Sequence, residues 1–224
     1  MMQGGIKLGK IIAVVSGKGG TGKTSFTANV GLALAALGCH TLCLDCDITL
    51  RNLDLALGLS DRALMDFTDV IAGRCTLEDA VVQHPKYPKL HLLTAPLSAR
   101  PVPIAPEQMK ALLDRIRQTY DYCLIDAPAG LGMGFHLASD YADRAVVVTN
   151  TDASSLRDAQ RTAAFQRGHV GLVVASLQGL GQIAQAVERT ALRGAQRGSA
   201  TRGHVLELLK QSLSVHLGVP KIID

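Results

Sequence analysis

The sequence contains no tryptophan, and only 4% of its residues are aromatic. Ala, Leu, Val and Gly are abundant instead, within a hydrophobic fraction of 47%. This balance suits helices packed closely on a parallel sheet better than it suits a β-sandwich. With 224 residues the chain is long enough to bury a sizeable core. We therefore expect one α/β domain over residues 1–224.

The sequence also lacks a recognisable signal segment and any apolar run of the roughly 18 residues that a membrane-spanning helix requires. Its five cysteines are an odd number, and four of them lie in or beside apolar segments. That pattern is typical of a protein kept in a reducing compartment. We expect a cytoplasmic protein, with any membrane contact peripheral and on the inner face of the cell membrane.

Positive charge is concentrated late in the chain. Residues 161–224 hold eight Lys and Arg against three Asp and Glu, whereas residues 1–160 hold 15 against 16. A solvated basic face is the simpler interpretation, and attraction to nucleic acid or anionic lipid is the alternative. The same two interpretations apply to an arginine stripe there, formed by Arg189, Arg193, Arg197 and Arg202. The leucines of residues 204–217 have helical spacing, and the stretch has little basic character, which favours a packing helix over a membrane-contacting one.

Short apolar runs alternate with helix-like stretches along the chain. The runs predict strands at residues 10–16, 41–45, 90–95, 122–127, 144–150 and 170–176. The clearest helical stretches are 22–37, 61–73, 76–83 and 105–120. This alternation predicts βαβ units in a mostly parallel, twisted sheet. Because the runs are apolar throughout, we expect helices on both faces of the sheet.

A phosphate-binding loop follows the first predicted strand. Residues 17–24 read GKGGTGKT and satisfy the pattern G-x-x-x-x-G-K-[ST] between a buried strand and an Ala-rich helix. Its glycines let backbone N–H groups turn toward a phosphate at the helix N-terminus. The expected nucleotide-binding residues are Gly17, Lys18, Gly19, Gly20, Thr21, Gly22, Lys23, Thr24 and Ser25. Among them Lys23 would reach the β- and γ-phosphates, and the Thr24 hydroxyl would hold Mg²⁺.

Lys18 is surplus to this loop, because Lys23 already occupies the position that such a loop reserves for lysine. Lys18 precedes the remaining glycines, where its side chain would point out of the loop. Taken alone, it is either an exposed lysine without a role or a residue aimed at something else.

Three aspartates follow predicted strands. Asp45 ends the strand at 41–45, Asp47 lies two residues later, and Asp126 lies at the end of the strand at 122–127. Ligands bind at the carboxyl ends of strands in parallel α/β sheets. Asp45 and Asp47 together would therefore suit a magnesium shell and a water-positioning group, and Asp126 would suit a second holder of Mg²⁺. The alternative for Asp45 and Asp47 is that they cap turns or a helix.

Cys43 and Cys46 form a C-x-x-C pair, a spacing that also occurs in metal and redox sites. They lie at a strand end whose alternation would send their side chains to opposite sides of the sheet. We interpret both as core cysteines.

Together, the KGGTGKT loop with its extra lysine, DCDITLRNLDLALGL, DAPAG and TNTDASSLRDAQR resemble the MinD/ParA family of deviant-Walker P-loop ATPases, and its MinD branch in particular. The resemblance covers about residues 8–165. It implies a weak, partner-stimulated ATPase that uses ATP and Mg²⁺ and forms a homodimer when loaded with ATP.

The resemblance also assigns roles to individual residues. Lys18 would act in catalysis by reaching the phosphates of the partner subunit, and Asp47 would orient the attacking water. The metal would be held by Thr24, Asp45 and Asp126. The remaining switch and dimer-face residues would be Asn52, Asp152, Arg157 and Asp158.

For the MinD branch the implied function is spatial regulation of cell division and septum placement, with division-regulator proteins of the MinC and MinE kind as partners. A peripheral membrane surface is expected in preference to DNA. Two alternatives remain, namely a ParA-like partition ATPase that binds DNA nonspecifically and a nucleotide-binding module without turnover. Residues 166–224 depart from the family pattern, since no Asn follows Asn150 to contact the base. These residues are a native but divergent ending, a truncated ending, or the product of an altered reading frame.

Overall fold

Seven strands form one sheet in the order β3-β4-β2-β5-β1-β6-β7. The computed structural model describes residues 8–97, 103–165 and 171–176. Its strands are β1 (Lys10–Val15), β2 (Thr41–Asp45), β3 (Val82–Gln83), β4 (Leu90–Leu93), β5 (Tyr122–Asp126), β6 (Arg144–Thr149) and β7 (Gly171–Ser176). All neighbouring strands are parallel except β3 and β4. The mostly parallel sheet and the six expected strands are therefore confirmed.

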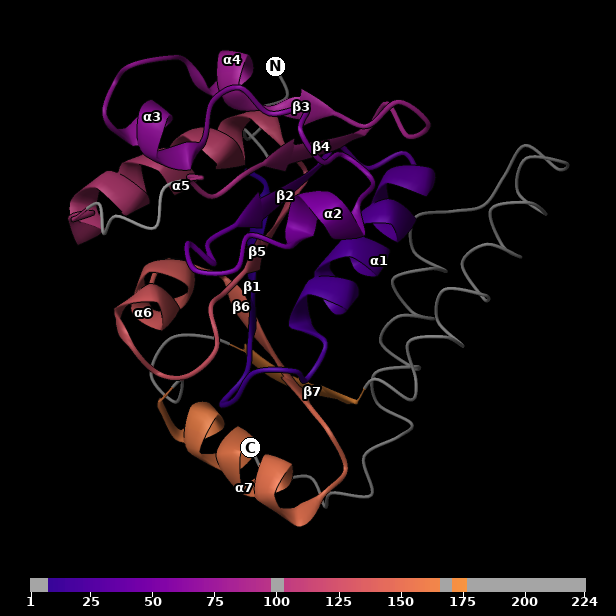
Figure 1. Cartoon of the computed structure of the whole chain (residues 1–224), viewed down its shortest axis with the longest axis vertical. Helices are drawn as coiled ribbons and strands as arrows, with labels where there is room; N and C mark the ends of the chain where they lie inside the picture. Colours follow the sequence, from indigo (N-terminus) through magenta and orange to yellow (C-terminus); the bar gives the residue numbers. More distant parts are fainter. Residues whose placement is uncertain (1–7, 98–102, 166–170, 177–224) are drawn as a thin grey trace, which may run out of the picture.

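Helices cover both faces of this sheet, with α1 and α2 on one side and α5 and α6 on the other (Figure 1). The helices are α1 (Lys23–Ala36), α2 (Leu53–Ala56), α3 (Phe67–Ile71), α4 (Leu77–Ala80), α5 (Pro106–Thr119), α6 (Met133–Ser139) and α7 (Ala153–Phe165). Strand side chains alternate between two buried clusters. Leu42 and Leu44 join the cluster of α5 and α6, whereas Leu90 and Leu92 join the cluster of α1 and α2. This is the two-sided burial that the apolar strands predicted.

The two cysteines of the C-x-x-C pair belong to different sides of the sheet. Cys43 is fully buried in the cluster of α1 and α2, and Cys46 is buried in the cluster of α5 and α6. Burial raises the pKa of both thiols well above the usual value. Their interpretation as core cysteines is confirmed.

Two of the expected helices are shorter than the sequence predicted. Only 67–71 of the stretch 61–73 is helical, and its N-cap Asp66 makes a capping box with Asp69. The stretch 76–83 divides into α4 and the two-residue strand β3, so the prediction of a helix over its last part was wrong. A capping box between Thr76 and Asp79 starts α4. Val82 instead pairs with Leu92 of β4, because neighbouring-strand hydrogen bonds override a short helical pattern.

The expectations for the arginine stripe and for the leucine-rich stretch 204–217 fall outside the described residues. Within the described ranges, no helix combines the length and apolar character needed to cross a membrane.

Helix α7 packs directly against the start of the phosphate-binding loop. A Cβ atom added to Gly17 would lie 2.8 Å from the Asp158 Cβ atom and 2.9 Å from the Asp158 carbonyl oxygen. The Thr162 hydroxyl, which donates a hydrogen bond to that same carbonyl, would lie 3.0 Å away. Gly17 is therefore required for the close approach of α7, in addition to any role with phosphate.

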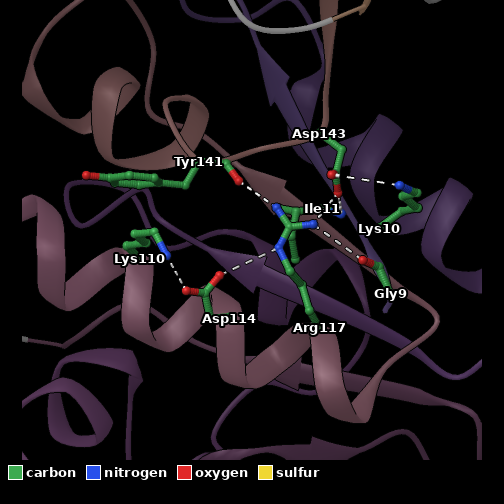
Figure 2. Close-up of polar contacts among 8 residues, drawn as sticks. All are labelled: Gly9, Lys10, Ile11, Lys110, Asp114, Arg117, Tyr141 and Asp143. Carbon is green, nitrogen blue, oxygen red and sulfur yellow. Dashed lines mark hydrogen bonds and ion pairs between the residues drawn. The ribbon is translucent and has the colours of Figure 1, made fainter. Parts of the chain in front are cut away.

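A network of charged groups closes the opposite, amino-terminal edge of the sheet (Figure 2). Arg117, near the end of α5, donates hydrogen bonds to the Asp143 carboxylate, to the Tyr141 carbonyl at 2.8 Å and to the Gly9 carbonyl at 3.4 Å. The same Asp143 carboxylate accepts the Ile11 backbone N–H at 2.7 Å. The guanidinium thus joins α5 to the first residues of β1 and to the loop before β6.

We expect Arg117→Met to destabilise the fold, since it leaves the Asp143 carboxylate partly buried without its main cation. The free energy of unfolding should fall by about 1–3 kcal/mol. Urea denaturation at neutral pH measures it. Arg115→Met is the matched control, because Arg115 pairs with Glu78 on the surface and such pairs contribute less than about 1 kcal/mol. Equal losses in the two variants would contradict this role of Arg117.

We also expect Gly17→Ala to destabilise the nucleotide-free chain by about 1–3 kcal/mol, because the new methyl group must push α7 away from the loop. Gly19→Ala is the control within the same loop, since a Cβ there meets no atom nearer than the Ala129 Cβ at 3.9 Å. Urea denaturation without nucleotide separates this packing effect from phosphate binding. A Gly17→Ala chain as stable as Gly19→Ala would show that α7 docking does not depend on the glycine.

Candidate nucleotide-binding site

The carboxyl ends of β1, β5 and β2 meet at one edge of the sheet. Asp126 of β5 pairs in register with Val14 of β1 on one side and with Asp45 of β2 on the other. The two predicted carboxylates therefore end adjacent strands, beside the loop that follows β1. Both are almost completely buried, with 0% of Asp45 and 2% of Asp126 exposed.

The phosphate-binding loop has the backbone that its glycines predict. Gly20 and Gly22 adopt left-handed conformations with φ of 72° and 88°, and Gly22 is the N-cap of α1. Such turns at a helix N-terminus direct N–H groups toward a bound anion. Ser16 closes the base of the loop, since its hydroxyl donates to the Lys18 carbonyl at 2.6 Å. The sequence pattern gave no indication of this hydrogen bond.

Lys23, Thr24 and Asp126 form a compact group where the loop enters α1. The Thr24 hydroxyl donates to Asp126 Oδ2 at 2.6 Å. Lys23 is 7% exposed, and burial lowers its pKa. The negative charges of Asp126 and Asp47 act in the other direction and raise it. Burial raises the pKa of Asp126 to about 6, although the hydrogen bond from Thr24 lowers it. One cation is therefore held among buried and half-buried carboxylates.

Asp45 organises the segment that follows β2. Its Oδ1 accepts the Asp47 N–H at 2.9 Å, and its Oδ2 accepts the Leu53 N–H, at the start of α2, at 3.1 Å. Burial and the neighbouring Asp126 raise the pKa of Asp45 to about 7. The capping role considered for Asp45 is thus present in the structure. Asn52 is the N-cap residue of α2, but its side chain makes no capping hydrogen bond.

Asp47 is half-buried and also caps a turn. Its Oδ1 accepts the N–H groups of Thr49 at 3.0 Å and Leu50 at 3.1 Å. Its negative charge raises the pKa of Lys23, so the carboxylate lies close enough to interact electrostatically with the loop lysine.

The group fits a divalent cation bound together with phosphate. Asp126 Oδ1 is buried and has no hydrogen-bond partner among the described residues, although buried polar atoms are normally paired. It belongs to a carboxylate that already faces the Thr24 hydroxyl and ends the strand next to Asp45. Hard oxygen donors of this kind are those that Mg²⁺ prefers. A cation there would also relieve the repulsion that contributes to the raised pKa of Asp45.

Lys18 is directed away from its own loop and onto the start of α7. Its Nζ donates to the Ser154 hydroxyl at 3.3 Å and lies 3.6 Å from Asp152 Oδ1. Asp152 is itself fixed by hydrogen bonds from the Ser154 hydroxyl at 2.6 Å and the Ser155 N–H at 3.0 Å, which lower its pKa. Lys18, predicted to act in catalysis, and Asp152, predicted to lie near the dimer face, are therefore brought together.

The remaining predicted residues lie further along α7. Arg157 is exposed, and Asp158 packs on Gly17 and pairs with Arg161 at 3.8 Å. Ser154 was missed by sequence reasoning. Its available signal was the Asp-x-Ser-Ser pattern of residues 152–155, which is a helix N-cap pattern but does not reveal a contact with Lys18.

Known proteins with similar sequences match over the same region. The AAA domain family matches residues 9–166, close to the 8–165 expected from the motifs. The septum site-determining protein MinD of Bacillus subtilis is 43% identical over 155 residues, which make up 69% of this chain and 58% of that protein. The putative MinD of Guillardia theta is 43% identical over 182 residues, 81% of this chain and 64% of that protein. The chain thus spans about three fifths of the length of these relatives.

Solved structures agree with the sequence matches. The structure of the MinC:MinD cell division complex of Aquifex aeolicus matches with 40% identity and a TM-score of 0.65, covering 74% of this chain and 68% of that one. MinD of Pyrococcus horikoshii, complexed with Mg-ADP, matches with 32% identity and a TM-score of 0.66, covering 75% and 69%. With the family model matching well over half of its residues, this chain belongs to the MinD family of AAA-domain P-loop proteins.

Proposed function

We propose that this protein is a MinD-like ATPase that dimerises when loaded with ATP and takes part in placing the division septum. The proposed ATPase activity rests on the group of Lys23, Thr24 and Asp126, in which the buried Asp126 Oδ1 has no hydrogen-bond partner within the described part of the chain. The names of the relatives, which are septum site-determining proteins, support the cellular part.

The loop would bind the phosphates of ATP through its backbone N–H groups and the N-terminus of α1. Lys23, held beside the carboxylates, would neutralise the β- and γ-phosphates. Thr24 and Asp126 would hold Mg²⁺, with Asp45 supporting it through water, and the metal would supply further neutralisation of phosphate charge. The Mg-ADP bound in the Pyrococcus relative supports this assignment.

Asp47 would orient the attacking water. Its Oδ1 is already occupied by two backbone N–H groups of its own turn. The carboxylate is therefore fixed in direction before substrate arrives. A prearranged group of this kind lowers the entropic part of a reaction barrier.

Lys18 would complete the site of a second copy of the chain. In the isolated subunit its ammonium contacts Ser154 and Asp152 of α7 instead of its own loop. This position on the outer side of the loop supports delivery to a partner. Arginine residues supplied in this way accelerate phosphoryl transfer by about 10³–10⁵. A lysine is a less well matched donor, consistent with weak turnover that a partner stimulates.

Division regulators are the proposed protein partners. The Aquifex relative was solved as a complex of MinC with MinD, which supports a MinC-like partner for this chain. We further propose that the dimer acts at the inner face of the cell membrane as a peripheral protein. A vesicle sedimentation assay with anionic lipid, with and without ATP, tests this step.

We expect Lys18→Ala to remain monomeric with ATP and Mg²⁺ and to lose turnover, while retaining nucleotide affinity, because its own loop keeps Lys23. Light scattering measures the dimer and phosphate release measures turnover. Lys86→Ala, which removes an exposed lysine from the turn before β4, is the control. Wild-type dimerisation and turnover in Lys18→Ala would refute the role in the partner subunit.

We expect Asp47→Ala to accumulate the ATP-bound dimer, because binding remains while hydrolysis is slowed. The fraction of dimer with ATP and Mg²⁺ should rise above that of the unaltered chain, and removal of Mg²⁺ with a chelator should abolish turnover in both. Phosphate release and light scattering on the same samples report both quantities. Normal hydrolysis in Asp47→Ala would remove this residue from the mechanism.

A further inference from the structure

The turn between β2 and α2 is closed by hydrogen bonds that run from Asp47 to Arg51. The Asp47 carboxylate accepts the N–H groups of Thr49 and Leu50. The Asp47 carbonyl accepts the Arg51 N–H at 2.9 Å. Asp47 is thus bonded through both its side chain and its backbone to the turn that Arg51 ends.

Arg51 holds an unfavourable backbone conformation at the end of this turn. Its φ is 40°, and among the described residues only Arg51 and Asp61 have a positive φ without being glycine. For a long side chain the left-handed region is disfavoured by contact between Cβ and the carbonyl oxygen. Such a conformation persists only where the surrounding structure enforces it.

Arg51 also makes a shielded ion pair with Asp54. Its Nε lies 3.4 Å from Asp54 Oδ2 in the first turn of α2, and the two side chains are only 12% and 13% exposed. The Nε atom is fully buried, and it makes no hydrogen bond within the described residues. A guanidinium so placed depends on the carboxylate beside it, because without Asp54 its charge would lose the nearest compensating group. The other Asp54 oxygen accepts the Leu55 N–H at 2.6 Å, which fixes the carboxylate at the start of α2.

We propose that Arg51 is a positioning residue for hydrolysis, whose ion pair with Asp54 keeps the 47–51 turn closed and so fixes the direction of the Asp47 carboxylate. This inference rests on the proposed water-orienting role of Asp47. Arg51 acts through the turn and is not itself a group that touches substrate.

The direction of Asp47 depends on the closed turn for a geometric reason. The N–H groups of Thr49 and Leu50 occupy Oδ1, and the described residues donate no hydrogen bond to Oδ2. The second oxygen is thus left for water. If the turn opens, Thr49 and Leu50 no longer hold Oδ1 and the carboxylate can rotate. Displacements of about 1 Å at a reacting group lower rates by about a hundredfold.

We expect Arg51→Ala to lower kcat for Mg-ATP by about tenfold or more and to change the Kd for Mg-ADP by less than about threefold, because the phosphate loop is untouched. Amide hydrogen exchange at Thr49 and Leu50 should become at least about tenfold faster. Asp54→Asn should reproduce both effects. Arg51→Lys keeps a cation near Asp54 and should recover part of the rate.

Two controls separate a positioning role of Arg51 from a general loss of structure. Arg115→Ala breaks the exposed pair with Glu78 and should leave kcat and exchange at the turn unchanged. In an Asp47→Ala background, Arg51→Ala should lower kcat no further, because the two residues act through one group. Should Arg51→Ala not fold, the milder Asp54→Asn and Arg51→Lys carry the same comparison.

The outcomes distinguish this inference from the function on which it rests. Slowed turnover in Asp47→Ala together with unchanged kcat and exchange in Arg51→Ala and Asp54→Asn would overturn the positioning role alone. A further loss of rate from Arg51→Ala in the Asp47→Ala background would overturn it as well. Normal turnover in Asp47→Ala would instead overturn the proposed role of Asp47, and exchange at Thr49 and Leu50 would still report whether Arg51 closes the turn.

Discussion

The register of β5 between β1 and β2 is the constraint on which the rest of the site depends. It sets Asp126 beside Asp45 and, through β1, beside the phosphate-binding loop. Two buried carboxylates on adjacent strands repel each other, and that repulsion contributes to the raised pKa of Asp45. The sheet by itself provides no group that offsets this repulsion. Lys23, the Thr24 hydroxyl and the N–H groups of Asp47 and Leu53 compensate it from α1 and from the turn after β2.

This compensation explains why the turn after β2 is built as it is. Asp45 uses both oxygens to hold the two ends of the segment 47–53, so the carboxylate that is repelled by Asp126 also fixes the loop after β2. Asp47 then holds its own turn, and Arg51 closes it at a backbone conformation that the ion pair with Asp54 must maintain. Each restraint relies on the one before it. A change at Asp45 should therefore reach Asp47 without any direct contact between their carboxylates.

The sequence predicted the parts of this arrangement that are local in the chain. A glycine-rich loop between an apolar strand and a helix, and aspartates at the ends of apolar strands, carry their own pattern within a few residues. The parts that it missed are set by tertiary contacts. The contact of Lys18 with Ser154 joins residues 136 positions apart, and β3 is a two-residue strand that exists only because it pairs with β4. Gly17 was assigned to phosphate, whereas its packing against Asp158 depends on where α7 lies.

These tertiary contacts give α7 two separate points of attachment to the phosphate-binding loop. Near its N-terminus, Asp152 and Ser154 hold the ammonium of Lys18, and further along its length Asp158 packs on Gly17. The first contact is partly exposed and joins flexible side chains, so it contributes little energy and can exchange readily. The second is close backbone packing, which changes only if the helix moves. In the proposed dimer, Lys18 would therefore leave Asp152 for the second subunit while α7 stays in place, and the loop would not need to unfold to release the lysine.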